Sequence, residues 1–247
     1  MILGIDTAGA VASVALVKGG AALAERMHPD RDSRPSCSPF FSPKGNHAEV
    51  LLPLIQELLE ESGWSLERLT GIALSIGPGS FTGLRIGLAT AKGIAYEWGV
   101  PVAGVSTLHA HAARIKNFNG VVCPLLDARK REVYTALFRS AGCRLERLAE
   151  DQLTSIQNAL ARARSLADEG GAFGFVGDGA RAYEKVIERE FGGGAVFFDK
   201  GSVAAAAACL AEERLSAGLS DDIGALAPVY LRSSEAETKL VKSHLTC

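Results

Sequence analysis

The glycine-rich stretch SIGPGSFTGLRIG, residues 75–87, has the composition of a phosphate-binding loop. Its glycines follow an apolar run and precede a predicted helix, and such junctions often present free backbone N–H groups to an anion. The specific motifs are absent, however. A leucine and an arginine follow Gly83, where a P-loop has lysine and a hydroxyl. The spacing of the glycines also departs from the dinucleotide fingerprint, and the strand predicted at 100–106 ends without the required acid.

Two acids at predicted strand ends indicate a nucleotide cleft. Asp6 ends the first strand and Asp127 ends the strand that opens the second half of the chain. Nucleotide phosphotransferases built by duplication place such acids across a cleft, but the bulky residues 128–131 follow Asp127 where a glycine turn is needed. Gly177 and Gly179 form a turn that would contact a nucleoside, although a plain strand–helix turn is the commoner explanation. We predict a vestigial cleft, with these four residues as candidates and no cofactor.

The histidines give no metal motif. His47 has a leucine one turn later instead of a second histidine, and His109 and His111 have no acid or cysteine near them in the sequence. No G-x-S-x-G nucleophile elbow is present either. We therefore assign neither metal ligands nor catalytic residues.

Two predicted helices, 47–61 and 82–98, have unusually wide apolar or small-residue faces. At about 100° per residue, the apolar residues of the first helix span roughly 200°, twice the stripe that covers one side of a core. The second helix carries small residues at every fourth position, which lets another backbone approach. Packing on the chain's own sheet is the alternative for the second helix. We predict a protein–protein interface formed by Val50, Leu51, Leu54, Ile55, Leu58, Gly83, Leu84, Gly87, Leu88, Ala91 and Ile94.

Composition limits the class of protein. The chain has 247 residues, 47% of them hydrophobic, and a formal net charge of -2, so it lacks the basic excess of most nucleic-acid-binding domains. Its five cysteines are scattered and contain no C-x-x-C pair, which favours a reducing compartment over a disulfide framework. We expect a cytoplasmic protein without a secretory leader or a membrane span.

The order of predicted elements suggests a duplication. Three strands, a helix, a strand, a helix and a strand fill residues 1–105, and a similar order begins again near Gly120. We predict an α/β fold of two halves, 1–105 and 106–247, each with a mixed sheet flanked by helices. The Pro- and Ser-rich stretch 29–46 has no periodicity and is predicted to be a surface loop.

Several motifs together resemble the TsaB (YeaZ) family. They are ILGIDTAGAVASVAL at the start, HAEVLLPLI, GPGSFTGLRIGLATAKGIA, LLDARKREVYTALF, GDGA and APVYLR. The resemblance covers nearly the whole chain and implies the actin, Hsp70 and sugar-kinase type of fold, with two ribonuclease-H-like halves. Two departures are the long stretch 29–46 and STLHAHA in place of the family's STLEALA.

The resemblance implies a role in making threonylcarbamoyladenosine beside the anticodon of tRNAs that read ANN codons. TsaC makes threonylcarbamoyl-AMP, TsaD transfers the group, the ATPase TsaE binds at the TsaB–TsaD junction, and TsaB is the non-catalytic partner. It further implies that the helices at 47–61 and 82–98 pair with TsaD or, without it, with a second copy, and that tRNA is contacted only through the complex. The alternatives are an ATP-binding phosphotransferase and a metallopeptidase-like protein.

Overall fold

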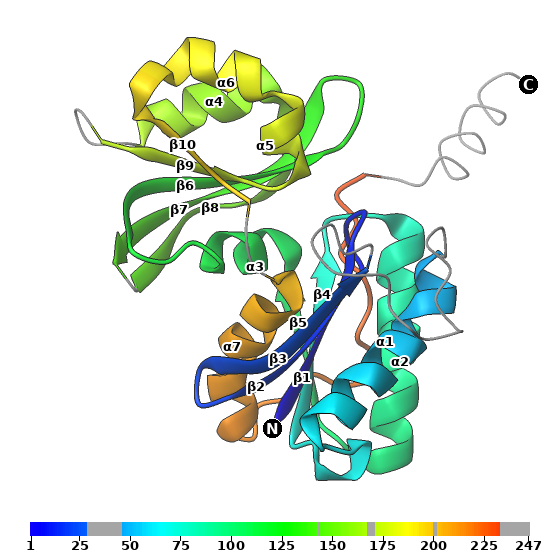
Figure 1. Ribbon diagram of the computed structural model, residues 1–247. Coiled ribbons are helices and arrows are strands. Elements are labelled where there is room, and N and C mark those ends of the chain that lie inside the picture. The colour runs from blue at the N-terminus through cyan, green and yellow to red at the C-terminus, as the bar shows by residue number, and fades with distance from the viewer. Residues whose placement is uncertain (29–45, 143, 167–170, 200–201, 233–247) are drawn as a thin grey trace, which may run out of the picture.

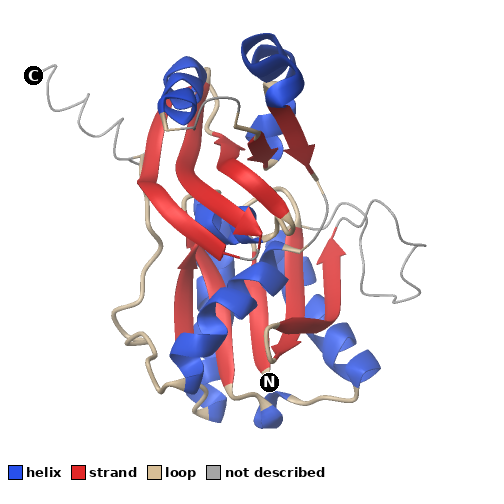
Figure 2. Cartoon of the chain, turned by 90° about the vertical axis from the view of Figure 1, so that its left-hand side faces the viewer, coloured by secondary structure: helices blue, strands red, loops and turns tan. Residues whose placement is uncertain are grey.

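Two five-stranded mixed sheets form the framework, one above the other in Figures 1 and 2. The computed structural model describes residues 1–28, 46–142, 144–166, 171–199 and 202–232. The first sheet has the order β3-β2-β1-β4-β5 and the second has the order β10-β9-β6-β7-β8, which is the same arrangement in the second half of the chain. In each sheet the first three strands of the half form an antiparallel meander and the last two are parallel to the first strand. The predicted duplicated ribonuclease-H-like fold is confirmed.

The strands of the two sheets have corresponding positions in their halves. The first sheet contains β1 (Ile2–Asp6), β2 (Ala12–Lys18), β3 (Ala21–His28), β4 (Gly71–Gly77) and β5 (Val102–Ser106). The second contains β6 (Phe118–Asp127), β7 (Glu132–Gly142), β8 (Arg144–Ser155), β9 (Phe173–Val176) and β10 (Ala195–Phe198). Asp6 and Asp127 therefore end equivalent strands, as the sequence predicts.

Helices α1 (His47–Ser62) and α2 (Phe81–Trp98) cover one face of the first sheet. Asn46 caps α1 by accepting from the backbone of Ala48, and its own N–H is bonded to Glu49 in a capping box. Ser80 caps α2 by accepting from Gly83 N at 3.2 Å. The side chains of both helices and the strands beneath them form one hydrophobic core.

Helix α7 (Val203–Ser216) covers the opposite face of the first sheet, although it lies in the second half of the sequence. Its small side chains let it approach closely: a Cβ at Gly4 would overlap the backbone of Ala204. The division of the chain into two domains near residue 105 stays a prediction. In the structure it separates β1–β5 from β6–β10, while α7 returns to the first sheet.

The second sheet carries α4 (Ile156–Ser165), α5 (Asp178–Ala182) and α6 (Glu184–Phe191) on one face and α3 (Thr107–Ala113) on the other. Two short helices, α5 and α6, stand where the first half has the single helix α2, and α3 and α7 have no counterpart in the predicted order of elements. No helix in the described ranges is long and apolar enough to span a membrane. Residues 29–45 of the predicted surface loop lie outside the described residues.

Candidate functional site

The turn that follows β1 is closed by the start of α2. Ser80 N donates to Ala8 O at 2.7 Å, and the buried Thr7 hydroxyl donates to Gly83 O at 2.7 Å. Gly83 N is in turn bonded to the Ser80 side chain. The N–H groups of Ser80 and Gly83 are therefore bonded within the chain, where an anion-binding loop would direct its N–H groups to a phosphate.

The glycines of residues 75–87 allow this contact. A Cβ at Gly83 would overlap Thr7 O, a Cβ at Gly87 would overlap the Thr7 hydroxyl, and one at Gly79 would lie 2.5 Å from Ala8 O. The glycine-rich stretch therefore provides close packing between α2 and the turn after Asp6.

Asp6 is enclosed beneath this turn, with only 3% of its surface exposed. Burial raises the pKa of its carboxyl group, and the nearest backbone donor, Ala8 N, is 3.4 Å from Oδ1. Arg114, a residue that the sequence analysis did not identify, opposes this shift through its positive charge. Its guanidinium also lies 3.2 Å from Nδ1 of His111, whose pKa burial lowers to about 3, so that imidazole is neutral and accepts the bond.

Asp127 lies in an open environment at the equivalent turn of the second half. Its N–H donates to Asp178 at 3.0 Å, and its carboxylate accepts from Arg129 N at 2.9 Å. Residues 129–131 all have positive φ values, 62°, 54° and 63°, and occupy the space after the strand with a tight β6–β7 turn. Their exposed side chains replace the glycine turn of a phosphate-binding loop, in agreement with the sequence argument.

Gly177 and Gly179 lie beside Asp127 and have a packing role. Gly177 has a φ of 104°, and a Cβ there would overlap Leu125 O. A Cβ on Gly179 would lie 2.9 Å from the same carbonyl. Both glycines therefore let α5 begin directly against β6, which favours the plain strand–helix turn over nucleoside binding.

The structure joins some candidate residues and leaves others apart. Asp127, Gly177 and Gly179 share one turn, and Asp6 lies against the glycine-rich stretch, but no hydrogen bond or ion pair between described residues joins Asp6 to Asp127. Among the described residues, no cluster of three His, Cys, Asp or Glu side chains could hold a metal. His109 stacks on Phe138, with ring centroids 5.1 Å apart.

The residues predicted as an interface are all buried in the single chain. The wide apolar face of α1 contacts two neighbours, the β2–β3 pair and α2, which accounts for its width without a partner. The small-residue face of α2 rests on the β1 turn, as the alternative interpretation held. The outer face of the same helices includes Leu52, 58% exposed, and Tyr96, 88% exposed. Contact of these helices with a partner stays a prediction, and it is these outer residues that are accessible.

The segment after α7 makes contacts that sequence reasoning did not identify, although its APVYLR motif was noted. Tyr230 stacks on Phe81 with centroids 4.2 Å apart and accepts a 2.9 Å hydrogen bond from Arg85 Nε. Arg232 donates to Ala128 O at 2.7 Å and pairs with Glu132. This segment therefore connects the start of α2 with the β6–β7 turn, and so links the two halves.

Two halves with the same sheet order, each a three-stranded meander extended by two parallel strands, define a protein of the actin, Hsp70 and sugar-kinase class of folds. A sequence model described as "TsaD: tRNA N6-adenosine threonylcarbamoyltransferase" matches residues 42–240. A protein of Bacillus subtilis named "tRNA threonylcarbamoyladenosine biosynthesis protein TsaB" is 30% identical over 251 residues, 98% of each chain. The chain belongs to the TsaB (YeaZ) family.

Two further relatives agree with this membership. The Escherichia coli protein of the same name is 38% identical over 140 residues, which is 56% of this chain and 54% of that protein. The structure described as "YeaZ from Pseudomonas aeruginosa" superposes with a TM-score of 0.73 at 26% identity, covering 93% of this chain and 99% of the other.

Proposed function

We propose that this protein is the non-catalytic subunit that supports TsaD in forming threonylcarbamoyladenosine in tRNAs that read ANN codons, together with the ATPase TsaE. In the proposal it acts in the cytoplasm, pairs with TsaD, and forms a homodimer when TsaD is absent. Family membership supports the pathway, because the relatives bear the name of this biosynthesis.

One observation carries the non-catalytic role: the start of α2 packs directly against the turn that follows Asp6. The Thr7–Gly83 and Ala8–Ser80 hydrogen bonds hold the two together. Asp6 is buried beneath them, and this burial raises the pKa of its carboxyl group. A chain with this turn contributes by binding a partner.

The outer face of α1 and α2 is the proposed contact surface. Its exposed residues include Leu52 on α1 and Ala89, Gly93 and Tyr96 on α2, and no side chain or backbone atom lies within 4 Å of a Cβ added at Gly93. The small residues of this surface leave room for the ridges of another helix pair. The eleven buried residues form the core that holds this surface in place.

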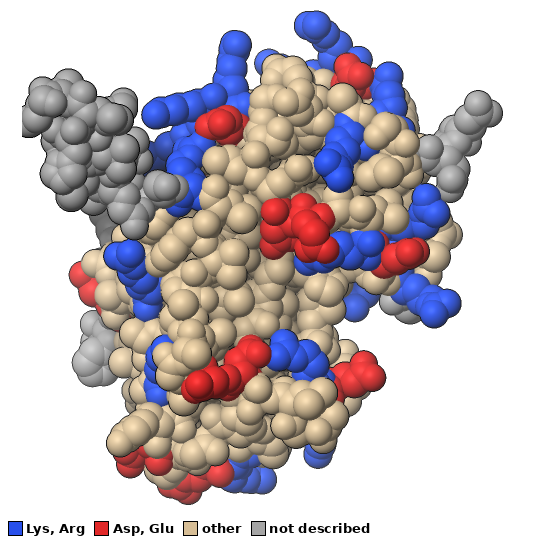
Figure 3. All heavy atoms as spheres, turned by 180° about the vertical axis from the view of Figure 1, so that it is seen from behind, with Lys and Arg blue, Asp and Glu red and all other residues tan. Residues whose placement is uncertain are grey.

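Contact with tRNA is assigned to the assembled complex. The face shown in Figure 3 carries Lys and Arg side chains mostly toward the end formed by the second sheet, with Asp and Glu side chains interspersed. With a net charge of -2, the chain lacks a large excess of positive charge to hold a phosphate backbone by itself.

Sedimentation of the purified chain alone and mixed with TsaD tests the pairing. The proposal expects a homodimer that converts to a heterodimer when TsaD is added. Two separate species in the mixture would contradict it. The alternatives have their own tests: calorimetric binding of ATP with magnesium would support the phosphotransferase, and stoichiometric zinc or iron in the purified protein would support the metallopeptidase.

A further inference from the structure

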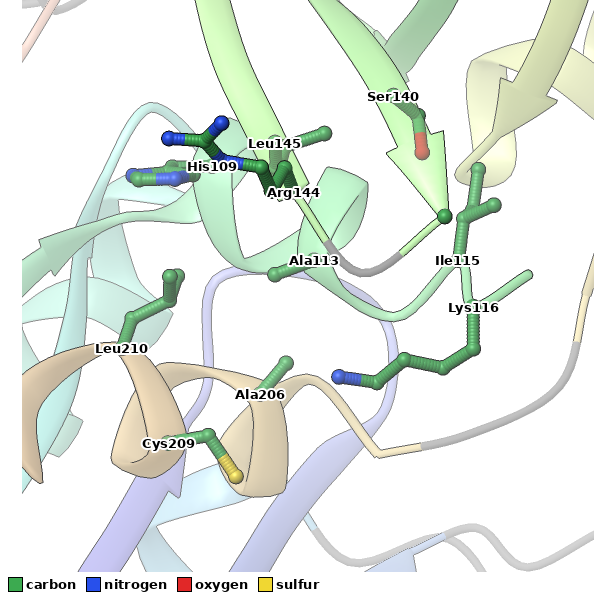
Figure 4. Close-up of a pocket in the computed structure, with 11 residues that line it drawn as sticks. His109, Ala113, Ile115, Lys116, Ser140, Arg144, Leu145, Ala206, Cys209 and Leu210 are labelled. Atoms are coloured by element: carbon green, nitrogen blue, oxygen red, sulfur yellow. The ribbon is translucent and has the colours of Figure 1, made fainter. Parts of the chain in front are cut away.

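A cavity of about 300 Å³ lies where α7 and α3 face the β7–β8 hairpin (Figure 4). Its walls come from both layers of the molecule, since α7 packs on the first sheet and the hairpin belongs to the second. At roughly 30 Å³ for a water-sized group, the volume admits a ligand of about ten such groups. This cavity is separate from the turns that follow Asp6 and Asp127.

One wall of the cavity is apolar. Ala206 and Leu210 project from α7, Ala113 comes from the end of α3, and Leu145 lies at the start of β8 (Figure 4). The two alanines leave space that larger residues at the same positions would fill. An organic ligand would gain its hydrophobic contacts along this wall.

Two cationic side chains also line the cavity, at different places. The Lys116 side chain extends across the space toward Ala206, and the Arg144 side chain lies near His109 (Figure 4). Neither Lys116 nor Arg144 forms an ion pair with any residue in the described ranges. Burial lowers the pKa of His109, so this ring is neutral at physiological pH and adds hydrogen-bonding capacity without charge.

The acids that act electrostatically on lining residues are engaged elsewhere. Glu212 accepts from the backbone N–H groups of Gly19 and Gly20, at 2.7 and 2.5 Å. Asp151 accepts from the Ser106 hydroxyl at 2.5 Å and from Arg147 at 2.6 Å. No acidic side chain among the described residues lines the cavity, so its two cations have a free anion-binding capacity.

We propose that this cavity binds a small organic monoanion, with its carboxylate at the Lys116 ammonium group and its apolar body along the wall formed by Ala113, Leu145 and Leu210. Charge-assisted hydrogen bonds select the acid group, and the alanine-lined wall selects the body. Because its walls belong to both layers, a bound ligand contacts α7 and the β7–β8 hairpin at once, and this role is independent of pairing with TsaD.

Isothermal titration calorimetry of the full chain at low salt tests the proposal with 3-phenylpropanoate, 3-phenylpropanamide and inorganic phosphate. The expected result is saturable binding of one 3-phenylpropanoate per chain, with the amide and the phosphate each at least about tenfold weaker. Equal affinity for the amide would overturn the cationic part of the site, and equal affinity for phosphate would overturn the apolar part. An absence of saturable binding by 3-phenylpropanoate would overturn the whole proposal.

Variants locate the binding. Lys116→Met and Arg144→Gln change exposed side chains and should leave the melting temperature unchanged. The first is expected to weaken 3-phenylpropanoate binding about tenfold or more, and the second to weaken it less. The matched control is Lys185→Met, an exposed lysine on α6 outside the cavity, which should bind as the parent chain does. Binding that survives both cavity substitutions would place the ligand elsewhere. Since the isolated chain is used throughout, failure here leaves the pairing test unaffected.

Discussion

The hydroxyl of Thr7 donates a buried 2.7 Å hydrogen bond to the carbonyl of Gly83, which joins the turn after β1 to the first turn of α2. Helix α2 packs against this turn, and the absence of side chains at Gly83 and Gly87 is what lets it approach.

The substitution Gly83→Ala should lower the stability of the folded protein. The new methyl group would overlap Thr7 O, and the backbone on both sides is fixed by hydrogen bonds, so we expect a loss of about 3 kcal/mol or more in the free energy of unfolding. Gly93→Ala on the same helix is the control: its Cβ meets open space, and alanine should add about 0.5–1 kcal/mol. Urea unfolding of both variants measures the difference. Equal changes would mean that the α2 contact with the β1 turn is loose.

Asp6→Asn should retain function. Burial raises the pKa of Asp6, so the unfolded chain releases this proton at a lower pH than the folded chain does. The free energy of unfolding of the wild type therefore falls as the pH rises from the ordinary aspartate range through the pKa of the folded state. The variant lacks this loss and should be relatively more stable at neutral pH. Its support of tRNA modification should stay within about twofold of wild type. An inactive but folded Asp6→Asn variant would point to a reactive cleft.

His111 should make the protein sensitive to acid. Burial lowers its pKa to about 3, while the unfolded chain takes up a proton near 6.5. Stability is therefore complete above pH 6.5 and falls as pH drops toward 3, by up to about 1.4 kcal/mol per pH unit for this one group. His111→Gln, which can still accept from Arg114, should have a shallower slope between pH 6.5 and 5. Parallel slopes for the two proteins in urea unfolding would contradict this assignment.

Leu52→Glu should weaken the proposed pairing and leave the fold intact. Leu52 is 58% exposed on the outer face of α1, so a charge there costs little in the monomer but would be buried in an interface. We expect affinity for TsaD to fall at least about tenfold in a sedimentation or calorimetric titration. Val186→Glu, 41% exposed on α6, is the matched control and should pair normally. Normal pairing by Leu52→Glu would remove this face from the proposed interface.

Most helices and strands could be predicted from the sequence because the patterns that mark them are local. The meander at the start, the capped α1 and α2, and the repeat of this order after Gly120 are marked by turn residues and by apolar periodicity. Helix α7 lacked such a signal. It is covered on two sides, by the first sheet and by α3, so its alanines give no polar face to mark a helical period.

The candidate site was only partly accessible to sequence reasoning. The blocked turn at residues 128–131 could be inferred, since side-chain bulk is visible in the sequence. The partners of the glycines could not, because Thr7 and Gly83 are separated by 76 positions. For the same reason, a wide apolar arc on α1 could not distinguish a protein partner from a second neighbour within the chain.

The most direct test is a reconstituted modification of unmodified tRNA with TsaC, TsaD, TsaE, threonine, bicarbonate and ATP, run with and without this protein. Our account predicts threonylcarbamoyladenosine only when the chain is present. The Asp6→Asn variant should restore the product as well as wild type does. Equal product without the chain would contradict the proposed function.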